Sequence, residues 1–208
     1  MHGLFFYIGL GAGLAVACGL RPFLPLLLLG GLGSANALNI DFPPGHWHFL
    51  ESTWWLIAVS AAFVLAYLAQ LLTGFSPIVD PVTREPRNDP LAAALTGLAI
   101  GAGALAFGGV LEAHGDLAWA GVAAGAVIVI LAQRLVGPLI VGARKRLAKK
   151  TERDALTLYL DGAAVLLAAL SALLPPLGYV AVAGVVALLL RRRSRSGQKY
   201  AGLRILGR

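Results

Sequence analysis

The sequence predicts an all-α membrane protein with six transmembrane helices, and three observations lead to this prediction. The 208 residues are 58% hydrophobic and only 13% charged, whereas soluble domains carry about 25% charged residues. Apolar runs long enough to cross a bilayer recur along the whole chain. Nearly all basic residues fall in alternate connections between these runs, which is the charge pattern of a polytopic membrane protein.

The apolar runs predict one six-helix transmembrane domain over residues 1–190. The first run is longer than the ~20 residues that a span needs, which indicates a tilted or broken helix. Pro22 and Pro25 fall inside this run and disfavour a continuous helix there. The six predicted spans are Gly3–Gly33, Thr53–Thr73, Pro90–Leu111, Leu117–Gly142, Ala155–Leu174 and Pro176–Leu190.

The basic residues predict the orientation of these spans. All but two of the 17 lysines and arginines lie in the connection after the second span, in the connection after the fourth span, or in the tail 191–208. The positive-inside rule therefore predicts that both chain ends are cytoplasmic. The basic tail and loops suit contact with anionic lipids. Nucleic acid is a poor partner, because membrane sidedness accounts for the charge and no binding module is visible.

The chain is compatible with a 3+3 inverted repeat of residues 1–112 and 117–190. Spans one and four each carry an arginine about two-thirds of the way along, Arg21 and Arg134, with proline close behind. Three spans per half would make the halves antiparallel, as in many transporters with interrupted helices. The alternative is that two spans rich in Gly, Ala and Leu align by chance.

Three ionisable side chains lie at membrane depth, where charges are costly and commonly functional. Arg134 and Asp161 lie on consecutive antiparallel spans at similar depth, so we expect an ion pair between them, more as a structural link than as a substrate contact. Arg21 has no acid at its expected depth, in the outer half of the membrane. It could pair with carbonyls freed at Pro22 and Pro25, or with an anion, a carboxylate or a lipid phosphate. Three acids of the outer connections are further candidate partners for Arg21: Asp41, Glu51 and Glu112.

The first outer connection contains His46 and His48, followed by Glu51. These are zinc-compatible ligand types, but the spacing is short and no further ligand cluster is evident. An ordinary interfacial loop is the alternative interpretation, and we expect neither a metal nor another cofactor.

From Gly19-Leu20-Arg21 in the first span to the closing Lys199–Leu206, the chain resembles an uncharacterised family of small bacterial inner-membrane proteins, known only as a domain of unknown function. The resemblance covers nearly the whole chain and implies no established reaction or ligand. The family pattern includes an acid late in the second span, where this chain has Tyr67. The resemblance lies in Gly19-Leu20-Arg21, Phe23-Leu24-Pro25, Pro77, Val79-Asp80, Asp161 and the closing Lys199–Leu206.

Two functions fit these observations. The first is a small transporter or channel-like protein that moves an anionic solute or a lipid headgroup past Arg21. The alternative is a non-catalytic accessory subunit, in a homo-oligomer or a larger membrane complex. An enzyme is not expected, since paired acids, a Ser–His set and a strong metal motif are missing from the sequence. A polar cavity that reaches Arg21 from one side would favour transport, and a dry core would favour a subunit.

Overall fold

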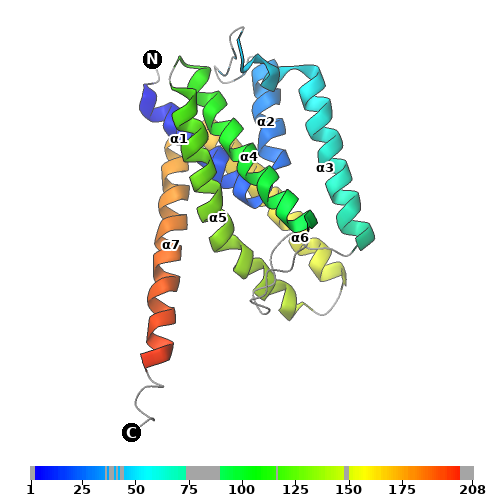
Figure 1. The fold of residues 1–208 in the computed structure, drawn as a ribbon, viewed down its shortest axis with the longest axis vertical. Coiled ribbons are helices and arrows are strands. Elements are labelled where there is room, and N and C mark those ends of the chain that lie inside the picture. Colours follow the sequence, from blue (N-terminus) through cyan, green and yellow to red (C-terminus); the bar gives the residue numbers. More distant parts are fainter. Residues whose placement is uncertain are drawn as a thin grey trace.

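A computed structural model describes residues 3–35, 37, 40, 42, 45–73, 90–115, 117–147 and 150–201. This part of the chain is all-helical, with seven α-helices and one short 3-10 helix (Figure 1). The helices are α1 (Leu4–Leu20), α2 (Phe23–Ser34), η2 (His48–Glu51), α3 (Thr53–Thr73), α4 (Pro90–Glu112), α5 (Ala118–Arg146), α6 (Lys150–Leu173) and α7 (Pro176–Ala201).

The first apolar segment is broken, as predicted, and forms the two helices α1 and α2. Arg21 ends α1 with an extended backbone, at φ −147° and ψ 115°, because a residue before proline is disfavoured in the α conformation. Pro22 then caps α2, and Pro25 lies in its first turn. Proline has no backbone N–H to donate. At Pro22 and Pro25 this costs no helix hydrogen bond, because the first N–H groups of a helix have no acceptor within it.

The break reverses the chain, so α1 and α2 form a helical hairpin with Arg21 at its tip (Figure 1). Near the start of α1, Tyr7 stacks on His114, which follows α4. Near the end of α2, Gly33 lies against the ring of Phe42 in the following connection. Both ends of the hairpin therefore lie at one end of the bundle, and its tip lies inside the bundle.

This arrangement differs from the predicted path of the first segment. In the described part of the chain this segment does not run through the bundle as a single helix, and the six crossings stay a prediction. The start of α1 lies at the end of the bundle opposite the end of α7 (Figure 1), which does not fit the prediction that both chain ends share one side. Basic residues in connections cannot reveal such a reversal, because the hairpin begins and ends without any lysine or arginine.

Helix α1 is the centre of the bundle and packs against α4, α5, α6 and α7. Its residues from Gly9 to Gly19 are all buried. Glycines permit the closest crossings: a Cβ on Gly178 would meet the carbonyl oxygen of Gly9, and a Cβ on Gly125 would meet that of Gly103. Small residues at helix contacts let backbones approach in this way.

Within the described residues, three helical stretches are long and apolar enough to cross a membrane: Ala93–Glu112, Ala118–Ile140 and Ala155–Leu173. The other apolar stretches are shorter, including α1, α2 and Thr53–Leu68 of α3. Helix α7 continues past Leu190 to Ala201, so the start of the predicted tail is helical. Helix α5 is continuous through Pro138 whereas α1 stops at Arg21, and the inverted repeat stays a prediction.

Candidate functional site: a pocket at the hairpin tip

The hairpin tip carries an ion pair between Arg21 and Asp161 of α6. Arg21 Nε lies 2.5 Å from Asp161 Oδ1, and each side chain is 15% exposed. The pairing that we expected for Asp161 was therefore wrong, because its partner is Arg21 and not Arg134. The expectation that Arg21 lacks an acid at its depth was wrong as well.

The direction of α1 explains this correction. A cytoplasmic N-terminus would place Arg21 in the outer half of the membrane. In the structure α1 begins at the opposite end of the bundle, so its 17 residues carry Arg21 about 25 Å inward. Asp161 lies eleven residues after the first residue of α6. It is therefore about 17 Å from the end of the bundle where α5 ends and α6 begins, which we call the basic end. The two side chains therefore meet inside the bundle.

The backbone around Arg21 adds polar groups to the tip. The last carbonyls of α1 have no donor within their own helix, and the first N–H groups of α2 have no acceptor within theirs. A cation is favourable at the end of a helix such as α1, and an anion is favourable at the start of one such as α2. Arg21 supplies the cation, and the N–H groups of Phe23 and Leu24 open α2 beside it.

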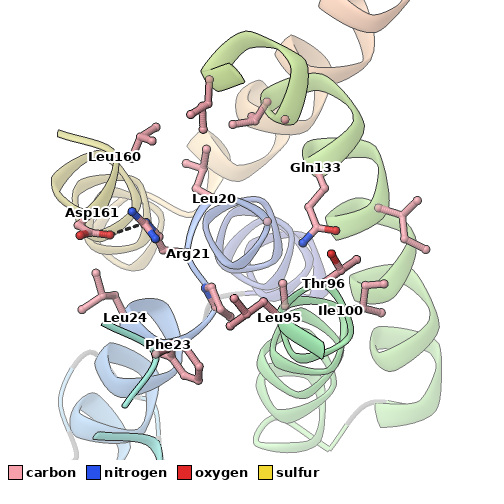
Figure 2. Close-up of a pocket in the computed structure, with 18 of the residues that line it drawn as sticks. Leu20, Arg21, Phe23, Leu24, Leu95, Thr96, Ile100, Gln133, Leu160 and Asp161 are labelled. Carbon is pink, nitrogen blue, oxygen red and sulfur yellow. Dashed lines mark ion pairs between the residues drawn. The ribbon is translucent and has the colours of Figure 1, made fainter. Parts of the chain in front are cut away.

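A pocket of about 520 Å³ surrounds the tip and contains both members of the ion pair. Figure 2 shows Arg21 turned toward Asp161 on one side, with Gln133 of α5 and Thr96 of α4 on the other. Pro22 and Arg134 also line the pocket, whereas Pro25 is buried in the core and does not. Most of the remaining wall is apolar: Leu20, Phe23, Leu24, Phe63, Ala66, Leu95, Ala99, Ile100, Ile130, Val136, Ile140 and Leu160.

The pocket lies toward the basic end of the bundle. Its wall on α4 comes from Leu95–Ile100, near the start of that helix, and its wall on α5 comes from Ile130–Ile140, in the second half of that helix. On the other side of the tip, α1 and α2 pack into a core with buried residues such as Leu14, Leu29 and Phe42. The hairpin thus separates the pocket from the opposite end of the bundle.

Arg134 differs from Arg21 in its surroundings. Its side chain is exposed, and among the described residues it has no carboxylate within ion-pair distance. Pro138, four residues later and also in the pocket wall, lacks the N–H that would bond the Arg134 carbonyl. The proline therefore adds a freed carbonyl to this side of the pocket.

Sequence reasoning missed the contribution of α3 and α4 to the pocket. Phe63 and Leu95 are ordinary apolar residues within apolar helices and gave no signal. Thr96 is a lone hydroxyl in such a run, which could have marked a wall position. Tyr67, late in α3, lines the same pocket.

The histidines of the first connection form a local contact. His48 Nδ1 lies 2.7 Å from Glu51 Oε1 and 3.1 Å from the carbonyl oxygen of Phe42. His46 is exposed in the preceding turn. Within the described ranges no group of three or more His, Cys, Asp or Glu side chains could hold a metal ion. The contact of His48 with Glu51 links the two ends of η2.

Part of the resemblance falls outside the described residues. Pro77 and Val79-Asp80 lie there, as do residues 202–206 of the closing motif. Six of the other landmarks converge, since Gly19, Leu20, Arg21, Phe23 and Leu24 line one pocket with Asp161. Residues that the sequence separates by more than a hundred positions thus form one site.

Apolar helices of span length, packed around a helical hairpin with an ion pair at its tip, are typical of an integral membrane protein. The family model described as Domain of unknown function (DUF4126) matches residues 8–195, and the chain belongs to this family. Among curated proteins and solved structures, nothing matches the chain.

Proposed function

We propose that the protein is a small transporter or channel-like protein of the bacterial inner membrane, acting on an anionic solute or a lipid headgroup. The observation that supports this most strongly is the pocket at Arg21, because a cavity that reaches this residue distinguishes a transport protein from a dry scaffold. Pockets of ~300–1,000 Å³ are typical of small-molecule sites, and this one is about 520 Å³.

The hairpin supports the same proposal. Irregular backbone at membrane depth is tolerated only where it is buried in protein or lines a water-filled cavity. Interrupted helices in transporters present their ends to the transported ion or solute. The break between α1 and α2 is compatible with both, since its residues from Gly19 to Leu24 line the pocket.

The basic residues support one orientation of the bundle in the membrane. The basic end of the bundle, where α5 ends and α6 begins, would face the cytoplasm under the positive-inside rule. The start of α1 would then lie outside, and the hairpin would be re-entrant from that side. The pocket would open toward the cytoplasm with the packed hairpin closing the outer side, which is an inward-facing arrangement.

A flux assay in proteoliposomes tests the proposal. Wild-type protein should accelerate the exit of one or more of chloride, phosphate and acetate, or the movement of a fluorescent acidic lipid between leaflets. Arg21→Gln should abolish that activity, while Arg146→Gln, the same change at an exposed residue outside the pocket, should retain it. Folded wild-type protein that moves none of these probes would contradict the proposal.

A non-catalytic accessory subunit is the second candidate, and the exposed surface of α3 favours it. Helix α3 packs mainly against α2 and η2 and exposes large apolar residues on several sides, with Trp54 82% exposed. Lipid or a partner helix would both cover this surface. Purification from a mild detergent as a stable complex or oligomer, which the change Leu65→Glu on α3 disrupts, would support this role.

A further inference from the structure

We infer that the pocket binds a membrane lipid with an acidic headgroup, that Arg134 holds the headgroup, and that the lipid enters sideways past α3. This inference rests on the proposed function and names the substrate class for the same pocket. It assigns the charge of the ligand to Arg134 and not to Arg21, where the sequence would place it.

The charges of the pocket give the first step. The charged residues of the described pocket wall are two arginines, Arg21 and Arg134, and one acid, Asp161. Together they leave the pocket with one net positive charge. Asp161 already neutralises Arg21, since its Oδ1 lies 2.5 Å from Arg21 Nε. Arg134 is exposed and, in the described part of the chain, has no acidic partner within ion-pair distance. An acidic ligand is therefore complementary to Arg134.

The apolar wall gives the second step. Leu20, Phe23, Leu95, Ile100 and Leu160 face the pocket alongside the few polar groups. A small hydrated anion would have to give up much of its water against such a wall and would gain only the few polar groups there as partners. An acyl chain that arrives from the bilayer has no hydration to lose and packs against the same surface. The site thus fits a ligand with one acidic group and an apolar body.

The position of α3 gives the third step. Its residues Phe63, Ala66 and Tyr67 form one wall of the pocket, while Val64, Leu65 and Leu68 between and after them are exposed on its other faces. Helix α3 packs mainly against α2 and η2, and it lies at the side of the bundle (Figure 1). A single helix therefore separates the pocket from the surrounding lipid, which is a suitable arrangement for lateral entry.

The depth of Arg134 agrees with a headgroup site. Arg134 lies six residues before Ile140, the end of the apolar stretch of α5, or about 9 Å inside it. An arginine at this depth can extend its guanidinium toward the interface, where lipid headgroups lie. The basic residues that follow α5 would also concentrate anionic lipids at this end.

A binding experiment on the whole purified protein tests the inference. Native mass spectrometry in a neutral detergent would compare phosphatidylglycerol, phosphatidylcholine, diacylglycerol and glycerol 3-phosphate as probes. We expect phosphatidylglycerol to bind, and Arg134→Gln to weaken its binding about tenfold or more. The matched change Arg146→Gln should leave the affinity within about twofold.

Each alternative outcome overturns the inference in a different way. Equal binding of glycerol 3-phosphate would identify a soluble anion as the ligand. If diacylglycerol or phosphatidylcholine bound as tightly as phosphatidylglycerol, the site would not recognise the acidic headgroup. Equal losses in Arg134→Gln and Arg146→Gln would assign the effect to surface charge.

The binding assay separates this inference from the proposed function. Phosphatidylglycerol binding without movement of any probe in proteoliposomes would uphold the lipid site and contradict transport. Flux of a soluble anion without phosphatidylglycerol binding would uphold transport and contradict the lipid site.

Discussion

Arg21 Nε and Asp161 Oδ1 lie 2.5 Å apart, and they connect the tip of the α1–α2 hairpin to α6. Removing one member of a buried pair leaves an uncompensated charge, whereas removing both does not. The pair therefore fixes the hairpin tip in place and sets one side of the pocket.

A double-mutant cycle measures this link. We expect Arg21→Gln and Asp161→Asn each to destabilise the protein by about 3–5 kcal/mol, and the double variant to lose much less than their sum. Thermal unfolding in detergent would provide the measurement. The cycle of Arg134→Gln with Asp161→Asn is the control and should be additive. Additive losses in the Arg21–Asp161 cycle would contradict the pairing.

The sequence predicted the helices and the break but not the path of the chain. Apolar runs mark helices wherever they pack, and Pro22 disfavours a helical Arg21 whatever surrounds it. The direction after the break depends on contacts such as Tyr7 with His114 and Gly33 with Phe42. Those contacts join distant parts of the sequence, so local pattern could not reveal them.

The three charged residues of the pocket stand out in the sequence, but their pairing does not. An ionisable residue in an apolar span stands out by itself, which is why Arg21, Arg134 and Asp161 were all singled out and all line one pocket. To assign ion-pair partners one must know how deep each residue lies in the bundle, and that depth depends on the path of the chain. One reversed helix was enough to exchange the partner of Asp161.

The reversal itself can be tested by labelling. The single cysteine, Cys18, is buried, so wild-type protein should give only background reaction with a membrane-impermeant maleimide. Gly3→Cys, before α1, and Leu117→Cys, before α5, should both react from the same side in intact cells. Arg146→Cys should react only after the membrane is opened. Labelling of Gly3→Cys and Leu117→Cys from opposite sides would show that the first segment crosses the membrane.

The crossing of α1 and α7 predicts a large difference between two glycines of the same helix. A Cβ on Gly178 would lie far inside contact distance of the Gly9 carbonyl oxygen, while nothing lies within 4 Å of a Cβ on Gly184. Gly178→Ala should therefore lower stability by about 1–3 kcal/mol through overpacking. Gly184→Ala should be neutral or slightly stabilising, because alanine favours the helix. Equal midpoints of thermal unfolding for the two variants would contradict this close crossing.

Filling the pocket from α3 should block its occupant without unfolding the protein. Ala66 faces the pocket, and a tryptophan there would occupy part of the space of about 520 Å³. We expect Ala66→Trp to reduce flux and phosphatidylglycerol binding at least about tenfold, since the added ring would compete directly with the acyl chain. Val64→Trp, two residues earlier and 52% exposed, places the same ring toward lipid and should leave both activities unchanged. If Ala66→Trp remains folded by thermal unfolding and retains wild-type flux and lipid binding, the transported or bound molecule does not use this pocket. Loss in both variants would instead point to α3 as a whole, through a changed contact with α2.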